Sequence, residues 1–373
     1  MIHVFIGTKA QLIKMAPLMA GLQHRNIPYN FIFSGQHQAT IQNIRQEFSL
    51  KDPDIVLYRG KDVTGIFQML VWAIRIFTFT LWNRQKVWQG DRNGIVLNHG
   101  DTFSTLLGTF LARVCGQRSA HIESGLRSYN LFHPFPEELT RILTFSFSDI
   151  YFAPGDWAIG NLKRYRGIKV NTIHNTLLDA LKICEKDVNE SNVDIPDHPY
   201  ALVSLHRFEN IFSKKKLAEI IDLLIRVSDT IPLLFILHKP TEKKLAQYNL
   251  KAKLEKCPNI ELRPRYSYFQ FIKLTKHASV VITDGGSNQE ECLYLGKPCI
   301  IMRNTSERQE GLGKNAVVSK YRFEAFERVI TDFPSYEYAA GHTNVSPTDI
   351  IIDTLTELSK GTKSPGSPQR YEE

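Results

Sequence analysis

Two acidic turns, each following a short run of β-branched and apolar residues, constrain this sequence most strongly. The run at 94–97 leads into His99-Gly100-Asp101, and the run at 118–122 leads into Glu123-Ser124-Gly125. Residues 105–114 between them have a helical pattern, so the stretch predicts one β-α-β unit. Ligands of an open parallel sheet lie beyond the carboxyl ends of its strands. We therefore expect Asp101 and Glu123 to point into one crevice.

A third acidic position follows these two turns. Glu137 and Glu138 come directly after Pro136, with Arg141 about one helical turn further along. Carboxylates that converge on one place contribute little to a fold, but they can take up and release protons. The sequence therefore predicts an acid/base site built from Asp101, Glu123 and Glu137.

Strand-like and helix-like patterns alternate along the whole chain, which is typical of the α/β class. At 373 residues, 43% of them hydrophobic, the chain can bury two ordinary cores. The pattern restarts near residue 200, after an acidic and proline-containing stretch at 187–198. We expect two doubly wound, Rossmann-like domains that face an interdomain cleft. Their expected bounds are 1–175 for the amino-terminal domain with the acids, 176–362 for the carboxyl-terminal domain, and 363–373 for a mobile tail.

Two glycine-containing turns are candidates for binding phosphate. Gly7-Thr8-Lys9 lies between the first predicted strand and helix, and Lys14 adds a second positive charge. The run Asp284-Gly285-Gly286-Ser287 opens a helix in the second half, where backbone amides and the helix dipole favour an anion. Glu291, about one turn further, is placed to accept hydrogen bonds from ribose hydroxyls. An ordinary β-α turn is the alternative interpretation of each run.

The cysteines indicate the cellular compartment, and the net charge indicates the kind of partner. The five cysteines form no CxxC pair and no metal-ligand spacing, which favours reduced thiols in the cytoplasm. The first residues run straight into a strand, so we expect no signal peptide, and we expect no metal or redox cofactor. The formal net charge of +8 fits either a solvated basic surface or an anionic partner, such as a nucleotide sugar or a membrane face. We expect no nucleic-acid partner.

The segment 66–82 is unusually apolar for a surface helix. Arg75 lies near its middle, and a membrane-spanning helix here would separate two strands of one sheet. The segment is therefore expected to be core or the interface of a homodimer. The alternative is peripheral contact with the inner face of a membrane, helped by Arg84 and Lys86.

The motifs, taken together, resemble the UDP-N-acetylglucosamine 2-epimerase family, which has the two-domain GT-B fold. The resemblance covers about residues 1–320 and is carried by Gly7-Thr8 with Ile13-Lys14-Met15-Ala16-Pro17, His99-Gly100-Asp101-Thr102, His121-Ile122-Glu123-Ser124-Gly125-Leu126-Arg127, Pro136-Glu137-Glu138 with Arg141, His206-Arg207, Thr283-Asp284 with Gln289-Glu290-Glu291, and Gly296-Lys297-Pro298 with Met302-Arg303. It implies that the carboxyl-terminal domain binds UDP and that the sugar lies against the acids of the amino-terminal domain.

The resemblance also implies roles for single residues. Family members expel UDP from the sugar to form a glycal and then return a proton to carbon 2 from the other face. That chemistry needs no metal or redox cofactor, and it serves bacterial surface polysaccharide synthesis. The implied catalytic residues are Asp101, Glu123, Glu137 and His206, and the implied substrate-binding residues are Lys9, Lys14, Arg127, Arg141, Gly285, Gly286, Ser287 and Glu291.

Several positions depart from the family pattern. The usual Arg-Pro-Glu after Gly-Thr is Lys9-Ala10-Gln11 here, and the usual Asp-Ser-Gly-Gly is Asp284-Gly285-Gly286-Ser287. Ala39 and Phe208 stand where non-hydrolysing members help bind a second, activating substrate molecule. Three hypotheses follow: an epimerase, hydrolysing or not, for UDP-N-acetylglucosamine or a related UDP-sugar; a GT-B glycosyltransferase at a membrane; and a catalytically silent UDP-sugar binding subunit.

Overall fold

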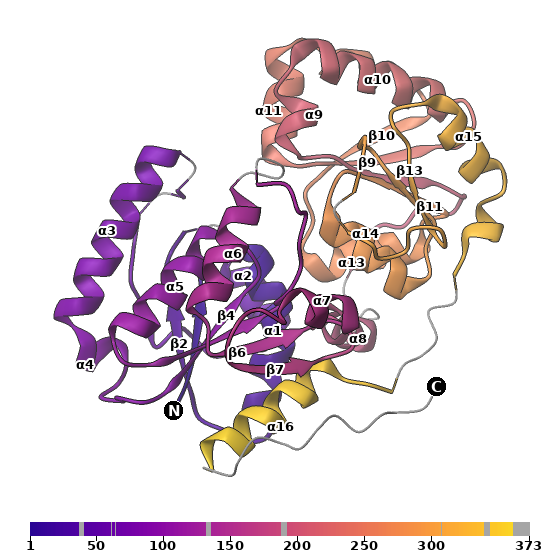
Figure 1. Cartoon of the computed structure of the whole chain (residues 1–373). Helices are drawn as coiled ribbons and strands as arrows, with labels where there is room; N and C mark the ends of the chain where they lie inside the picture. The colour runs from indigo at the N-terminus through magenta and orange to yellow at the C-terminus, as the bar shows by residue number, and fades with distance from the viewer. Residues whose placement is uncertain are drawn as a thin grey trace. The chain divides into compact units, whose positions relative to one another are not determined.

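The computed structural model describes residues 1–36, 41–60, 62–63, 65–131, 136–187, 192–306, 308–338 and 344–360. The chain divides into two compact units (Figure 1). The first contains residues 1–183 and the chain from residue 344 onward, and the second contains residues 184–343. Each unit is a parallel β-sheet flanked by helices.

The first unit has a parallel sheet of seven strands among the described residues. In spatial order they are β3 (Ile55–Val56), β2 (Tyr29–Phe33), β1 (Ile2–Ile6), β4 (Ile95–His99), β5 (Arg118–Ile122), β6 (Ile150–Ala153) and β7 (Ile168–Asn171). Its helices are α1 (Lys9–His24), α2 (Ile41–Glu47), α3 (Ile66–Trp82), α4 (Arg84–Val87), α5 (Phe103–Val114), α6 (Glu137–Phe147), α7 (Asp156–Asn161), α8 (Leu177–Asp187), which runs on into the second unit, and α16 (Pro347–Ser359).

The second unit has a parallel sheet of six strands over the same described part of the chain. Their order is β10 (Ile260–Pro264), β9 (Leu233–Leu237), β8 (Ala201–Ser204), β11 (Val280–Thr283), β12 (Cys299–Ile301) and β13 (Ala316–Val318). Its helices are α9 (Phe208–Ile211), α10 (Lys214–Ser228), α11 (Lys239–Gln247), α12 (Lys251–Glu255), α13 (Tyr268–His277), α14 (Gly286–Leu295) and α15 (Phe323–Thr331), with the 3₁₀ helix η1 (Phe333–Tyr336). Both strand orders are Rossmann-like, which confirms the predicted fold class.

Each sheet has a point where the direction of the crossovers reverses. It lies between β1 and β4 in the first unit and between β8 and β11 in the second. Because the connecting loops diverge there, a crevice for ligands opens beyond the carboxyl ends of the two strands. The residues at these two positions are 7–8 and 99–101 in the first unit, and 205–207 and 284–286 in the second.

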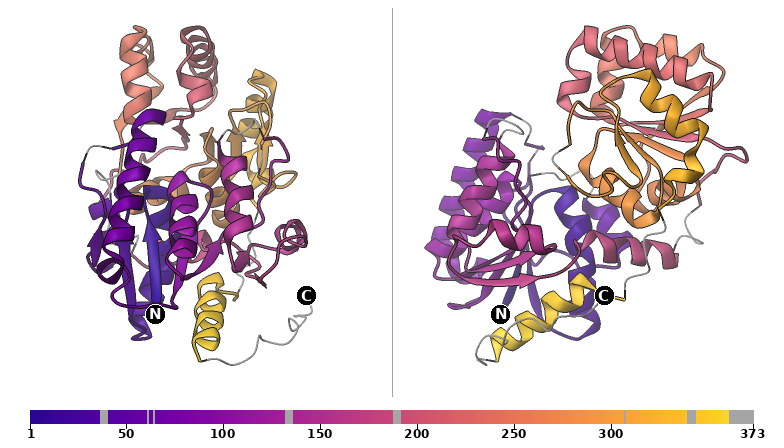
Figure 2. Two further views of the ribbon diagram at one scale, coloured as in Figure 1. Left: turned by 60° about the vertical axis from the view of Figure 1, so that its left-hand side comes forward. Right: turned by 45° about the vertical axis from the view of Figure 1, so that its right-hand side comes forward.

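Helices α3, α5 and α6 form one layer of the first unit (Figures 1 and 2). Trp72 and Ile76 of α3 are buried in a core that includes Val96 of β4 and Leu111 of α5. The opposite side of α3 exposes apolar side chains, so the predicted segment 66–82 is core on one face only. Among the described residues, no helix has the length and apolarity needed to cross a membrane.

The expected bounds 176–362 placed the carboxyl-terminal helix in the second domain, but this helix belongs to the first unit. The chain returns after residue 343, and α16 packs against α1 of the first unit (Figure 2). Arg25, at the end of α1, pairs with Asp349 and Asp353, while Asp179 accepts hydrogen bonds from Ser346 Oγ and the Thr348 amide. The boundary between the units falls within α8, after Ile183 rather than residue 175. The expected tail 363–373 lies outside the described residues.

Candidate functional site

Glu123 follows β5 in a backbone conformation that few residues other than glycine adopt, with φ at +63°. This conformation costs about 1–2 kcal/mol, so the contacts around the side chain must hold it. Its Oε1 accepts hydrogen bonds from Lys14 Nζ and Asn175 Nδ2, both at 2.5 Å. The side chains of Lys14 and Glu123 are only 5% and 7% exposed. A buried ammonium beside the carboxylate stabilises its negative charge, so it favours the ionised side chain, the form that a general base needs before it takes up a proton.

Asp101 follows β4 and has a cation of its own. Arg141 of α6 donates from Nη2 to Asp101 Oδ2 at 2.5 Å. The Asp101 side chain is 30% exposed, so solvent or a ligand can reach it. The two acids at neighbouring strand ends are therefore each paired with a different basic residue.

Gly100 brings these two acids close together. Its φ of +70° lies in the left-handed region, and a Cβ there would come within 3.2 Å of Glu123 Oε2. His99 approaches the same carboxylate, with Nδ1 3.8 Å from Glu123 Oε2. The prediction that Asp101 and Glu123 meet at one edge of the sheet therefore agrees with the geometry.

Glu137, the third predicted acid, begins α6 in the turn before Arg141. Its side chain is partly buried, and Oε2 has no hydrogen-bond partner among the described residues. Residues 132–135, just before it, lie outside the described part of the chain. A buried carboxylate oxygen without a partner is costly, so Glu137 is suited to a ligand rather than to the fold.

Glu138 binds Arg127 and also Arg141, the arginine that pairs with Asp101. Glu138 is fully buried and accepts hydrogen bonds from Arg127 Nε and, at 2.9 Å, from the Ser128 amide. Burial alone would raise the pKa of Glu138, but the Ser128 amide, Arg127 and Arg141 together hold it below the usual value. Arg127 donates a hydrogen bond from Nε to Glu138, and its predicted role in binding substrate stays a prediction.

The Gln11 side chain accepts hydrogen bonds from the backbone amides of the first glycine turn. Its Oε1 accepts from the Gly7 and Thr8 amides at 2.9 and 3.0 Å, and its Nε2 donates to the His99 carbonyl at 3.0 Å. The Gln11 side chain thus forms a capping box at the start of α1 and takes up the amides that were expected to bind phosphate. Lys14 is directed to Glu123, and Lys9 lies partly exposed in the first turn of α1.

In the second unit, Asp284 organises the turn that carries His206. Asp284 is fully buried and accepts hydrogen bonds from the His206 and Arg207 amides at 2.9–3.1 Å and from Asn210 Nδ2 at 3.0 Å. The His206 ring lies with Nδ1 3.3 Å from Asp284 Oδ1, and it is tilted against the ring of His238 with the centroids 4.8 Å apart. The His206 side chain is 40% exposed, so a ligand can reach it.

The predicted ribose acceptor, Glu291, is more enclosed than expected. It is 3% exposed, and it accepts hydrogen bonds from Tyr268 Oη at 3.1 Å and Asn288 Nδ2 at 2.8 Å. Burial, with the nearby Glu291 charge, raises the pKa of Tyr268 well above its usual value, so the hydroxyl stays a donor. A carboxylate has further lone pairs, so a role in binding ribose stays a prediction.

Arg308, in the loop after β12, is a basic residue beside Gly286 that was not among the predicted site residues. A Cβ on Gly286 would lie 2.8 Å from Arg308 Nε, so the guanidinium crosses the first residue of α14. Arg308 Nη1 is held by Glu290 at 2.9 Å. Gly285, Gly286 and Ser287 thus present the amino-terminal end of α14 beside a cation, an arrangement that favours a phosphate. A basic residue in the loop after β12, the neighbouring strand, was the signal available in the sequence.

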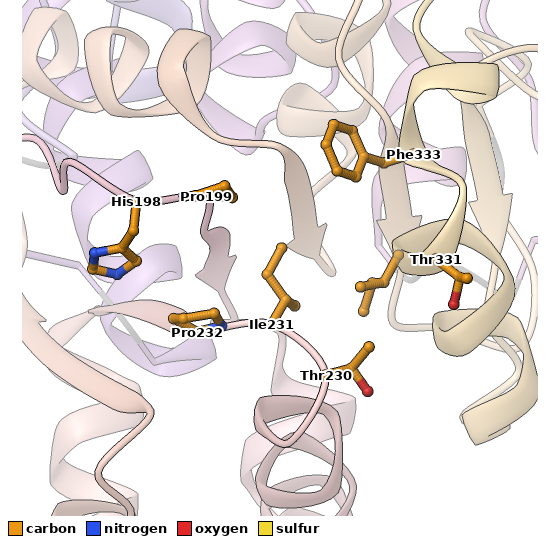
Figure 3. Close-up of a pocket in the computed structure, with 8 residues that line it drawn as sticks. His198, Pro199, Thr230, Ile231, Pro232, Thr331 and Phe333 are labelled. Atoms are coloured by element: carbon orange, nitrogen blue, oxygen red, sulfur yellow. The ribbon is translucent and has the colours of Figure 1, made fainter.

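A separate hollow lies on the second unit, away from these residues (Figure 3). It has a volume of about 480 Å³ and is mostly apolar, with His198, Pro232 and Phe333 in its lining. Pro232 precedes β9, so the hollow is at the amino-terminal edge of the sheet, opposite the carboxyl ends that carry His206 and Asp284. It contains none of the predicted site residues.

Comparisons with known proteins find relatives over most of the chain. A sequence model of the family described as UDP-N-acetylglucosamine 2-epimerase matches residues 20–332. The UDP-N-acetylglucosamine 2-epimerase of Methanocaldococcus jannaschii is 32% identical over 335 residues, covering 85% of this chain and 88% of the relative.

Two solved structures with bound ligands have the same fold. The UDP-GlcNAc 2-epimerase of Neisseria meningitidis bound to UDP-GlcNAc matches with a TM-score of 0.81 at 26% identity, covering 95% of this chain and 99% of that one. The Methanocaldococcus jannaschii enzyme in complex with UDP-GlcNAc and UDP matches with a TM-score of 0.77 at 28% identity, with the same coverage. By sequence and by fold, this chain belongs to the UDP-N-acetylglucosamine 2-epimerase family, a family of isomerases with two Rossmann-like, GT-B domains.

Proposed function

We propose that this protein inverts carbon 2 of UDP-N-acetylglucosamine, or of a closely related UDP-hexosamine, by eliminating and re-adding UDP. The observation that carries the proposal is the pair Asp101 and Glu123 at neighbouring strand ends, each beside its own cation. Inversion needs one group to remove a proton from one face and another to return a proton to the other face. Solved relatives with UDP-GlcNAc bound support the substrate class.

The chemistry accounts for three acids rather than two. The carbon 2 proton of the sugar is not acidic, so the anomeric C–O bond breaks first and its electron pair leaves with UDP. The cationic sugar then loses the carbon 2 proton to Asp101 or Glu123, which forms the C1=C2 bond of a glycal. The other acid protonates carbon 2 from the opposite face while UDP adds back to carbon 1. Glu137 supplies negative charge that stabilises the cationic stage.

UDP belongs, in this proposal, to the second unit. His206 and the amino-terminal end of α14, formed by Gly285, Gly286 and Ser287, hold the diphosphate, with Arg308 as a further cation. The support is the helix N-terminus with Arg308 across it and the exposed face of His206. Lys9, Lys14, Arg127, Arg141 and Glu291 stay predicted substrate contacts.

Incubation with UDP-N-acetylglucosamine alone, followed by NMR of the sugar, tests the proposal. A mixture with UDP-N-acetylmannosamine identifies a non-hydrolysing epimerase, and free N-acetylmannosamine with UDP identifies a hydrolysing one. Turnover only with an acceptor would identify the glycosyltransferase alternative, which the family relationship supports less. Binding without any turnover would identify the silent subunit.

We also propose that the protein is a cytoplasmic homodimer that supplies surface polysaccharide synthesis. The dimer contact would be the outer face of α3, where Phe67 and Trp82 are 78% and 85% exposed, Ile74 62% and Leu70 52%. Such an apolar surface is larger than monomers usually leave in water, and the same helix of a second copy can cover it. Peripheral membrane contact is the competing occupant, because Arg75 and Arg84 are also exposed.

A further inference from the structure

We propose that His121 is a positioning residue that locks the two acid-bearing turns together as a neutral imidazole. The inference rests on the proposed function, because it concerns how Asp101 and Glu123 are held for that reaction. His121 is the next-to-last residue of β5. It is fully buried, so it does not itself contact a substrate.

The imidazole of His121 joins the two turns directly. Its Nε2 lies 2.7 Å from the carbonyl oxygen of Gly100, the residue before Asp101. Its Nδ1 lies 3.0 Å from the hydroxyl of Ser124, the residue after Glu123. The His121 side chain thus contacts the residue next to each acid, and the proposed reaction gives His121 no other role.

The hydrogen-bond network fixes the tautomer. A carbonyl oxygen only accepts, so Nε2 must carry the proton and donate to Gly100. Burial lowers the pKa of His121 to about 4, although the Gly100 carbonyl, Glu123 and Asp101 act in the opposite direction and Arg141 acts with burial. At neutral pH the ring is therefore uncharged, and Nδ1 accepts a hydrogen bond from Ser124.

The two turns need such a lock because both are irregular. Gly100 and Glu123 each have φ in the left-handed region, at +70° and +63°. The Gly100 amide also donates to the Ile122 carbonyl at 3.0 Å, so Gly100 is held at both its amide and its carbonyl. Loss of the hydrogen bond from His121 would leave the Gly100 carbonyl without this donor, and the distance between Asp101 and Glu123 could then change.

Three substitutions separate the two bonds. His121→Gln keeps an amide donor close to the position of Nε2 and preserves the bond to Gly100. His121→Asn places its amide near Nδ1, where it reaches Ser124 but falls short of Gly100. His121→Phe keeps the ring volume against Phe145, whose ring lies 5.5 Å away, and removes both bonds.

His3 offers a matched control. It is another fully buried histidine of the same sheet, its pKa also lowered to about 4 by burial, and it contacts Asn30 and Asp91 near the start of β1. His3→Phe should lower the melting temperature without changing kcat of the folded protein. It therefore measures the cost of losing a buried histidine away from the acids.

Turnover of UDP-N-acetylglucosamine by the full chain is measured for each variant, with UDP affinity by calorimetry and melting temperature alongside. We expect kcat to fall about 100-fold in His121→Phe and His121→Asn, the scale of an ångström-sized misplacement, and by less than about tenfold in His121→Gln. KM and UDP affinity should change little. Full kcat in His121→Asn, or equal loss in His121→Gln and His121→Phe with both folded, overturns the proposal.

A loss of kcat without a change in KM distinguishes positioning from a purely structural role, and nitrogen NMR of labelled histidine tests the tautomer itself. The signal absent from His121→Phe should show a protonated Nε2 and an unprotonated Nδ1, unchanged as pH falls from 7.5 to about 5.5. A ring that titrates near pH 6.5 overturns the lock. If the wild-type protein itself fails to turn over UDP-N-acetylglucosamine, the proposed function fails, while this NMR result still tests the lock.

Discussion

At the scale of single residues, Glu137 and Glu138 are neighbours with opposite environments. Glu138 is fully buried between Arg127 and the Ser128 amide, whereas one oxygen of Glu137 has no partner among the described residues. Glu137→Gln should lower kcat by about 10²–10⁴ and leave the melting temperature unchanged, because it removes a charge that serves the reaction. Glu138→Gln is the matched control and should lower the melting temperature, because it removes the buried negative charge that pairs with Arg127 and Arg141. Equal loss of stability in both variants would contradict the assignment.

The buried histidines predict how stability depends on pH. His3 and His121 have folded-state pKa values of about 4, below the ordinary 6.5. Between pH 6.5 and 4 the unfolded chain binds more protons, so stability falls as the pH falls through this window, by up to roughly 3 kcal/mol per histidine. His121→Gln should therefore lose less melting temperature than wild type between about pH 7 and pH 5. A pH dependence identical to wild type would show that His121 is not held neutral by the fold.

Strand-end position was enough to locate the acids, but not to assign every basic residue. Asp101 and Glu123 follow adjacent parallel strands, and that order alone predicts their proximity. Arg127 has the same charge as Arg141, and only the three-dimensional contacts show that it braces Glu138. Arg308 comes from a loop outside the glycine motif, so no local pattern in the sequence ties it to Gly286.

At the scale of elements, the start of α14 is the clearest test of the UDP site. A methyl group on Gly286 would meet the flexible Arg308 side chain at 2.8 Å and displace it from the helix end. Gly286→Ala should therefore weaken UDP binding by about 1–3 kcal/mol, the scale of a charged hydrogen bond, with little change in melting temperature. Gly160→Ala, in α7, meets no atom within 4 Å and should leave UDP affinity unchanged. Calorimetry that finds equal UDP affinity in both variants would count against this site.

Elements were predictable where the pattern was strong and local. The strands beside the acids, β4 and β5, and helix α5 between them follow from apolar runs and helical periodicity. Strand β3 is only Ile55–Val56, because its pairing with β2 ends there. The sequence also did not show which side of α3 faces the core, since apolar residues face both the core and the surface.

At the scale of the whole molecule, chain order misled the division into units. A helix near the carboxyl terminus is expected to complete the domain that precedes it, but α16 returns to the first unit. There Arg25 pairs with Asp349 and Asp353, Asp179 accepts a hydrogen bond from Ser346, and apolar residues of α16 such as Ile352 are buried. Contacts between residues so far apart leave no local pattern that a single sequence displays.

The outer face of α3 predicts the state of assembly. Phe67→Ser with Trp82→Ser should convert the protein from dimer to monomer in analytical ultracentrifugation, because each buried aromatic contributes roughly 1.5–3 kcal/mol to association. Trp157→Ser, which alters an exposed tryptophan of α7, is the control and should stay dimeric. Unchanged mass with loss of liposome binding would favour membrane contact instead.

The most direct test of the central claim, that acids at the ends of β4 and β5 exchange a proton at carbon 2, is turnover in D₂O. A proton removed by one carboxylate mixes with solvent before another acid returns one to the opposite face. We predict that the epimerised sugar carries deuterium at carbon 2 and that Glu123→Gln abolishes its formation while still binding UDP. An epimerised product that keeps its original hydrogen at carbon 2 would contradict the account.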